Sequence, residues 1–384
     1  MNIRIGAGIS ADRDPLEGSA EAASAAAAAL AGAHADLALV FASGAHLAAP
    51  EATLEVVHGA LAPAALIGCG AGGVLGAGRE LEDGTAVAVW AAASGGAGEL
   101  QAFHATAGDE AVDGLPDLEG ADGAILLADP YSFPTEIALA ALAEGAPTVP
   151  VLGGISSART GEDTGALFYG DEVHEQGAVG VSLRGIEMLP CVSQGAAPLG
   201  REVTITAAEG HIIHELAGRP ALETVERIIA ELRPRERSLI AAGVMIGIVI
   251  DSGKPEYTQG DFLVRGVLGA DPDTGQLAVG ATVHEGQVVR LHARDAKSAD
   301  EDLRRALSLR AEAIADAPPA GALVFSCNGR GRAMFGSRDH DAKAVERELR
   351  GAPAAGFFAA GEIGPVGGRS FLHGFTATLA VFPG

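Results

Sequence analysis

The sequence predicts an α/β (α+β) protein in which repeated strand–helix–strand units form two packed mixed-sheet domains with helices on the outside. Three observations support this fold class: a strand–helix–strand pattern that recurs three times, a middle region of alternating apolar and polar residues, and a composition suited to close packing. The chain has 384 residues, enough for two or three domains. Apolar residues make up 48% of it and aromatic residues only 4%, so small side chains are expected where helices lie on sheets.

The recurring pattern is an apolar strand, a helix, a glycine-rich strand end and an outer strand. The first strands of the three copies are LALVFAS (37–43), GAILLADP (123–130) and GALVFSCNGRG (321–331). The helices that follow are PEATLEVVHGAL, PTEIALAALAEG and DHDAKAVERELRG, and the glycine-rich strands are ALIGCGAGG, PVLGGISSA and AGFFAAGEIG. Each copy ends with an outer strand: GTAVAVW, GAVGVSL or TATLAVF.

The region from about 203 to 294 has a different pattern. VTITAAEGHIIHELAGRPAL predicts a hairpin that enters the helix ALETVERIIAELR, and the later residues alternate at period two around the turn DPDTG. An antiparallel meander is expected there. Because APLGRE before it reads as a connector, we expect two domains, at 1–200 and 201–384.

Charge and composition limit the partners. The net charge of −24 and the pI near 4.7 disfavour binding to nucleic acid or to an anionic membrane surface. The longest apolar run, 239–250, is shorter than the ~20 residues that span a bilayer, and the N-terminus lacks the pattern of a signal peptide. Three widely spaced cysteines do not make a disulfide framework. We therefore expect a cytoplasmic protein.

The strand end FSCNGRG is the first candidate ligand site. Cys327, Asn328 and Arg330 follow an apolar strand, and open α/β sheets bind ligands at such strand ends. The planar guanidinium of Arg330 suits a carboxylate or a phosphate. The alternative is that Arg330 pairs with a structural carboxylate, for instance Glu362.

The segment AAGEIG is the second candidate. Glu362 stands at an apolar strand end, where a carboxylate is costly without a partner. Gly361 beside it lets a ligand approach the backbone. An arginine and a glutamate facing one cavity would suit a zwitterion such as an amino acid, whereas a salt bridge between Arg330 and Glu362 would only hold the strands.

The first copy offers matching positions at its own strand ends. Ser43 ends its first strand, and Gly68–Cys69–Gly70 match Ala359–Ala360–Gly361 of the third copy. Cys69 and Cys327 are therefore expected near cavity mouths. A buried free cysteine is more often a small apolar side chain than a reactive one.

No metal site is predicted. His211 and His214 are three residues apart in a probable strand, so they are expected on opposite faces and cannot share a metal ion. The glycine-rich segments do not keep the spacing of a dinucleotide-binding fold, and no phosphate-binding or nucleophile motif is present.

Taken together, these segments resemble the FIST family, a sensory domain with an N-terminal and a C-terminal part. The resemblance rests on ALVFASGAH and ALIGCGAGGVLG in the first part and on GHIIHELAGRPALE at the junction. In the second part it rests on GDFLVRGVLGAD, VHEGQVVRLH, FSCNGRG and PAAGFFAAGEIGPV with FTATLAVF. It covers nearly the whole chain.

The resemblance implies a domain that binds small ligands such as amino acids and passes the signal to an attached or separate output module. We expect a sensor without catalytic activity, with an amino-acid-like molecule or a small carboxylate as its ligand. This chain has no room for such a module beside the FIST segments, so a signalling partner is expected to be a separate polypeptide. Some relatives bind haem, which keeps a haem-based gas sensor open, although no histidine stands out as its ligand. A small-metabolite enzyme with Cys327 as nucleophile and His340 or His373 as base also stays open, as does a scaffold without ligand.

Overall fold

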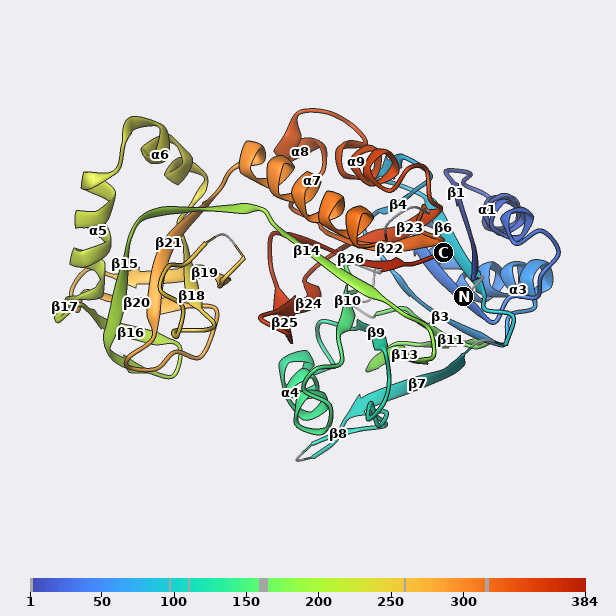
Figure 1. The fold of residues 1–384 in the computed structure, drawn as a ribbon, viewed down its shortest axis with the longest axis horizontal. Coiled ribbons are helices and arrows are strands. Elements are labelled where there is room, and N and C mark those ends of the chain that lie inside the picture. The colour runs from blue at the N-terminus through green and yellow to red at the C-terminus, as the bar shows by residue number, and fades with distance from the viewer. Residues whose placement is uncertain (1–2, 97, 110, 159–164, 259, 315–317) are drawn as a thin grey trace. The chain divides into compact units, whose positions relative to one another are not determined.

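The chain forms two compact units in the computed structural model, which describes residues 3–96, 98–109, 111–158, 165–258, 260–314 and 318–384. The first unit comprises Met1–Val192 and Leu303–Gly384, and the second comprises Ser193–Asp302. Most of their helices and strands are labelled in Figure 1. The mixed α/β fold class is confirmed, with four sheets among the described residues. The predicted division into domains at residue 200 stays a prediction.

The three predicted copies are present in the first unit. The first copy is β2 (Leu37–Ser43), α3 (Pro50–Leu61), β3 (Ala65–Gly70) and β6 (Ala86–Ala93). The second copy is β9 (Gly123–Ala128), α4 (Thr135–Gly145), β10 (Val151–Ile155) and β13 (Ala178–Arg184). The third copy is β22 (Gly321–Cys327), α9 (His340–Glu348), β23 (Ala354–Ala359) and β26 (Thr376–Phe382). In each copy the first strand pairs in parallel with the glycine-rich strand and antiparallel with the outer strand.

Each copy has one further strand beyond its outer strand. These strands are β1 (Arg4–Ser10), β7 (Glu99–Ala107) and β14 (Leu189–Gln194), next to β6, β13 and β26 respectively. α1 (Pro15–Ala29) packs against β1, and β8 (Val112–Asp113) extends β7. The chain reaches the second unit at the end of β14 and returns along α7 (Ala296–Ala313).

Each copy also gives a hairpin to the sheet of another copy. The hairpin β4 (Val74–Gly76)–β5 (Arg79–Leu81) of the first copy pairs with β23 of the third. The hairpin β11 (Leu167–Tyr169)–β12 (Glu172–His174) of the second copy pairs with β3 of the first. The hairpin β24 (Glu362–Val366)–β25 (Arg369–His373) of the third copy pairs with β10 of the second. The exchange is cyclic, so each of the three sheets of the first unit contains segments of two copies.

A glycine at one equivalent position allows the neighbouring strand to approach closely in all three copies. A Cβ added there would lie 2.1, 1.9 or 1.7 Å from a carbonyl oxygen of the neighbouring strand, at Gly68, Gly153 and Gly356. The predicted match of Cys69 with Ala360 was therefore wrong. Cys69 pairs with Phe41 as Phe357 pairs with Phe325, so Cys69 is level with Phe357. A glycine stands next to each of Cys69, Phe357 and Ala360, so the sequence alone does not reveal which residues are level.

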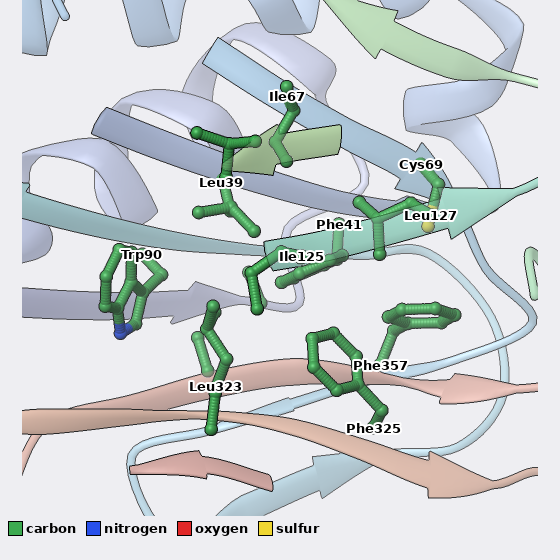
Figure 2. Packing of buried hydrophobic residues seen from close by; sticks show 14 of the residues in the cluster. Leu39, Phe41, Ile67, Cys69, Trp90, Ile125, Leu127, Leu323, Phe325 and Phe357 are labelled. Atoms are coloured by element: carbon green, nitrogen blue, oxygen red, sulfur yellow. The ribbon is translucent and has the colours of Figure 1, made fainter. Parts of the chain in front are cut away.

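The core of the first unit joins the inner faces of the three sheets (Figure 2). Leu39, Ile125 and Leu323 occupy the same position in the three copies, and all are buried. The ring of Phe41 stacks on that of Phe357 at 5.1 Å between centroids. Because the copies share one core, burial of their apolar side chains stabilises them together.

The second unit is an antiparallel sheet that closes into a barrel. Its elements are β15 (Ala196–Glu209), β16 (Ile212–Leu216), β17 (Arg219–Pro220), α5 (Ala221–Glu231), α6 (Pro234–Leu239), β18 (Met245–Val249), β19 (Phe262–Asp271), β20 (Gln276–Val279) and β21 (Val288–Arg294). The predicted hairpin before α5 is confirmed, and pairing of β15 with β16 closes the sheet. The predicted simple meander was wrong, because β21 lies between β15 and β18 and not beside β20.

Candidate functional site

The sequence predicted one site from Cys327, Asn328 and Arg330, but the turn after β22 directs these side chains into different surroundings. Cys327 and Arg330 are buried, whereas Asn328 is exposed. The backbone N–H of Asn328 donates to the carbonyl of Ala359 on β23. The strand end is therefore closed by main-chain bonds, and its charged group turns inward.

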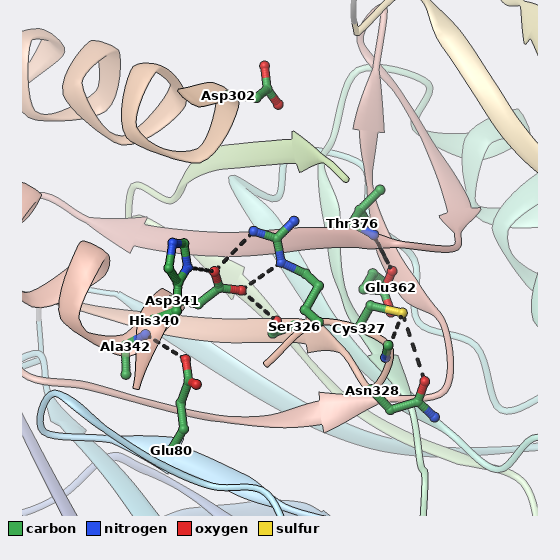
Figure 3. A network of polar contacts seen from close by, with 12 residues as sticks. Glu80, Asp302, Ser326, Cys327, Asn328, His340, Asp341, Ala342, Glu362 and Thr376 are labelled. Carbon is green, nitrogen blue, oxygen red and sulfur yellow. Dashed lines mark hydrogen bonds and ion pairs between the residues drawn. The ribbon is translucent and has the colours of Figure 1, made fainter. Parts of the chain in front are cut away.

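Arg330 pairs with Asp341, the second residue of α9. Its Nε lies 2.6 Å from Oδ2 and its Nη2 lies 3.0 Å from Oδ1 (Figure 3). Both side chains are 1% exposed. The fork that would hold a ligand carboxylate is thus occupied by a carboxylate of the chain itself. The sequence predicted the helix that contains Asp341, but it did not reveal that Asp341 would pair with Arg330.

Further groups complete this polar network. Ser326 donates to Asp341 over 2.9 Å, and His340 Nδ1 lies 3.0 Å from the other carboxylate oxygen. The ring of Phe335 stacks on His340 at 3.6 Å, and the Arg330 guanidinium lies 5.2 Å from the centre of the Phe335 ring. Although burial opposes ionisation, the Arg330 charge and these hydrogen bonds hold the pKa of Asp341 well below its usual range.

Glu362 is fully buried and occupies a position that is apolar in the other hairpins. In the pairing with the receiving sheet, Glu362 faces Gly154, as Leu167 faces Cys69 and Val74 faces Phe357. Its Oε2 accepts from the Thr376 N–H at 3.0 Å and hydroxyl at 2.8 Å (Figure 3). Burial raises the pKa of Glu362 to about 8, against the opposing effect of these bonds.

The predicted cysteines and Ser43 have structural surroundings. Cys69 lies in the apolar core, where burial raises the pKa of its thiol far above the ordinary value. Burial, with the nearby Glu362 carboxyl, raises the pKa of Cys327 to about 12. Ser43 donates to the carbonyl oxygens of Gly84 and Ala86. Cys327 and Glu362 come from two different sheets and are brought together, whereas Ser43 and Cys69 lie in a third sheet.

The two histidines considered as bases for Cys327 have other contacts. His340 is bound to Asp341, and His373 Nε2 lies 2.9 Å from the carbonyl oxygen of Gly364. A thiol with a raised pKa is a poor nucleophile near neutral pH. These contacts do not favour nucleophilic catalysis by Cys327.

A pocket of about 500 Å³ opens in the second copy, beside the predicted residue Gly361. It lies between the start of α4, the end of β10 and the exchanged hairpin β24–β25. Its lining is Pro130, Phe133, Pro134, Thr135, Glu136, Ile137, Ile155, Ala360, Gly361, Leu372 and His373. Of the predicted site residues, Gly361 lines this pocket, whereas Arg330 and Glu362 are not among its lining residues.

The connection from the first strand to the helix differs among the copies. In the first copy it contains the short helix α2 (Ala45–Ala48), and in the third it contains α8 (Arg332–Phe335). In the second copy, residues 129–134 join β9 to α4 without such a helix. In the first copy, Leu47 of α2 approaches Gly70, the counterpart of the pocket residue Ile155. The missing short helix is one reason that the second copy is open.

Within the described ranges, no group of three or more histidine, cysteine, aspartate or glutamate side chains is arranged to hold a metal ion. His211 lies in a turn and His214 in β16. Among the helices of the described residues, none combines the length and the apolar character needed to cross a membrane.

The protein is thus an α/β protein of three copies that exchange hairpins, and the barrel is inserted in the chain between the second and third copies. The second copy contains the pocket. Comparison with known proteins gives the family. Residues 36–219 match the FIST N domain and residues 221–365 match the FIST C domain, and the chain belongs to the FIST family.

Similar full-length relatives occur in mycobacteria. The uncharacterized protein Rv0628c of Mycobacterium tuberculosis is 43% identical over 385 residues, which cover 99% of this chain and 100% of the relative. The uncharacterized protein Mb0898c of Mycobacterium bovis is 42% identical over 382 residues, 99% of each chain.

Proposed function

We propose that this protein is a cytoplasmic, non-catalytic sensor that binds a small carboxylate or an amino-acid-like ligand and signals through a separate protein partner. The observation that supports this most is the pocket of the second copy. Its volume of about 500 Å³ falls in the range of ligand sites, roughly 300–1,000 Å³.

The lining of the pocket suits an apolar body with one polar end. Phe133, Ile155 and Leu372 supply apolar surface. The first turn of α4 supplies the positive end of a helix dipole, which favours a negatively charged group, and the Glu136 carboxylate of the same turn, which favours a positively charged one. Small carboxylates and amino acids with apolar side chains combine these two features.

The position of the pocket supports a sensing role. Its walls come from α4 and β10 of the second copy and from the hairpin β24–β25 of the third. A ligand that contacts all three walls binds best when the hairpin is docked, and it shifts the population towards that state. A partner that distinguishes docked from undocked hairpins would read the signal.

A ligand screen with a pocket-blocking variant tests the proposal. Ala360 is exposed and lines the pocket, so Ala360→Trp is expected to fill it with little cost to the fold. Ala28→Trp on the exposed side of α1 is the matched control. We expect amino acids or small carboxylates to raise the melting temperature of the wild type and of Ala28→Trp but not of Ala360→Trp.

Hydrogen exchange gives the second measurement. Ligand is expected to slow exchange in residues 362–373, the hairpin that forms one wall. If no compound in the screen stabilises the wild type, or if Ala360→Trp responds equally, the pocket is not the ligand site and the proposal fails.

A further inference from the structure

Two large apolar side chains are exposed beside the pocket of the second copy. Tyr131, in the connection from β9 to α4, is 71% exposed, and Ile137, in the first turn of α4, is 58% exposed. Ile137 also lines the pocket, and Tyr131 stands in the chain between the lining residues Pro130 and Phe133. The other large apolar side chains that are exposed in the described ranges come from three separate elements: Leu16, Leu268 and Leu309.

The fold holds Tyr131 in this exposed position. Asp129 Oδ2 accepts hydrogen bonds from the backbone N–H of Tyr131 at 3.0 Å and from that of Ser132 at 2.8 Å. The Ser132 hydroxyl donates to the same oxygen at 2.6 Å and accepts from the N–H of Gly177 at 2.9 Å. Because these bonds already fix the backbone of the connection, a partner that covers Tyr131 loses little free energy to ordering it.

The outer face of the second copy is acidic. α4 and residues 112–122 pack on the same face of the sheet, since Leu139 and Leu118 belong to one apolar cluster with Leu126 of β9. Residues 80–158 contain no lysine or arginine. The exposed carboxylates of α4 and of residues 112–122 are Asp113, Asp117, Glu119, Asp122, Glu136 and Glu144. These charges give the layer a negative potential, which attracts basic groups.

Two basic side chains come from strands that adjoin this layer. The guanidinium of Arg184, in β13, donates to the carbonyl oxygens of Asp117 and Glu119. Arg369 begins β25, which packs against α4, and its guanidinium lies 5.7 Å from the centre of the Phe371 ring. The carboxylates of the layer outnumber these two groups, so the layer stays negatively charged.

Charge decides which kind of partner fits this surface. The net charge of the chain is −24, so a second copy would be repelled. A segment with lysine or arginine is attracted instead, and its apolar side chains can cover Tyr131 and Ile137. A basic segment of another protein is therefore favoured over a second copy of this chain.

We propose that Tyr131 and Ile137, with the carboxylates of the same layer, form a docking surface for a partner segment whose apolar side chains are flanked by lysine or arginine. The inference rests on the proposed function and names the kind of partner. Tyr131 is the anchor, since exposed tyrosines with a fixed backbone are typical of interface hot spots. Because Ile137 also lines the pocket, a ligand and the partner would contact the same side chain, which couples the two binding events.

Three synthetic peptides of equal length test the kind of partner. KLLKKLLKKLLK is basic and amphipathic, ELLEELLEELLE reverses its charge, and KSSKKSSKKSSK removes its apolar side chains. By calorimetry with the whole chain at physiological salt, we expect the first peptide to bind at least ten-fold more tightly than either of the others. Salt at this concentration weakens general attraction between a basic peptide and an acidic protein.

Two double variants locate the binding surface. Tyr131→Ser/Ile137→Ser removes the two apolar side chains and leaves the net charge unchanged. Leu16→Ser/Leu309→Ser is the matched control, because it removes two exposed apolar side chains of α1 and α7. The first variant should lose at least ten-fold in affinity for KLLKKLLKKLLK, and the control should bind it as the wild type does.

The inference is wrong if the acidic peptide binds as tightly as the basic one, or if both double variants bind the basic peptide equally. Sedimentation velocity examines the alternative occupant. Self-association of the wild type that Tyr131→Ser/Ile137→Ser abolishes would assign the surface to a second copy and would also overturn the inference. The ligand screen with Ala360→Trp is separate: if the peptide binds as expected but no small ligand stabilises the wild type, the docking surface stands and the proposed function fails.

Discussion

Arg330 and Asp341 form a two-bond ion pair, with Nε to Oδ2 at 2.6 Å and Nη2 to Oδ1 at 3.0 Å, in surroundings that exclude water. The pair joins the turn after β22 to the start of α9. A buried ion pair depends on both partners, because either charge alone is left without compensation. Arg330 therefore stabilises the fold. Its replacement is not a suitable test of ligand binding, because it would also destabilise the protein.

Replacing Arg330 is expected to destabilise the protein strongly. Arg330→Ala leaves the Asp341 carboxylate buried and unpaired, which costs about 3–5 kcal/mol. The double variant Arg330→Met/Asp341→Leu removes both charges and should lose less than Arg330→Ala alone. Urea unfolding of the three proteins measures the difference. A loss of less than about 1 kcal/mol in Arg330→Ala would mean that the pair contributes no more than an exposed one.

Glu362 is expected to make stability depend on pH. Its pKa is about 8 in the folded protein and about 4.3 in an unfolded chain, so the folded state holds the proton more tightly. This contribution is complete below pH 4 and is lost as pH rises through 8. Glu362→Gln stays neutral, so its unfolding free energy relative to the wild type should rise by about 2–4 kcal/mol between pH 5 and 9.

The control for this pH dependence is Glu55→Gln, which changes an exposed carboxylate of α3. The stability of this variant should follow that of the wild type across the range. Parallel pH profiles of Glu362→Gln and wild type would show that Glu362 is ionised in the folded protein and that its environment is more polar than its burial implies.

Cys327 is expected to be unreactive in the folded protein. Burial raises the pKa of its thiol to about 12, and alkylation requires the thiolate. Iodoacetamide at pH 8.5, followed by peptide mass spectrometry, should modify Cys327 only after unfolding in guanidinium. Rapid modification with a midpoint near pH 8.5 would contradict this and would restore Cys327 as a candidate nucleophile.

Gly356 is expected to tolerate no side chain. A Cβ at this position would lie 1.7 Å from the Val324 carbonyl oxygen, so Gly356→Ala must separate β22 from β23 and should cost about 3 kcal/mol or more. Gly59→Ala in α3 is the control, since nothing lies within 4 Å of the added atom. It should be neutral or raise stability by up to ~1 kcal/mol. Equal melting temperatures of the two variants would refute the proposed role of the glycine.

The three copies were predictable because local pattern determines them. Apolar runs such as 37–43 and 321–327 are buried on both faces, and helices follow them in the chain. The hairpin before α5 was predictable for the same reason. The strand end at Gly361 was also predicted, and it does line the pocket.

The partners of these elements were not predictable from the same patterns. The exchange of hairpins joins segments such as 74–81 and 354–359, and the residues of neither segment indicate that the two will pair. Asp341 looked like an ordinary residue at a helix start, although it takes the guanidinium that seemed free for a ligand. The order of strands in the barrel was likewise decided by pairing between distant segments.

By itself, the sequence determined the elements, their threefold recurrence and the acidic character of the chain, because spacing and composition act over a few residues at a time. Only the tertiary structure decided that Arg330 is neutralised by Asp341, that Glu362 is sealed at a core position, and that the second copy is the open one. These outcomes depend on which distant side chains share one buried space. An unpaired charge is costly in such a space. The second copy has room for a pocket because it lacks the short helix that the other two copies have at this place.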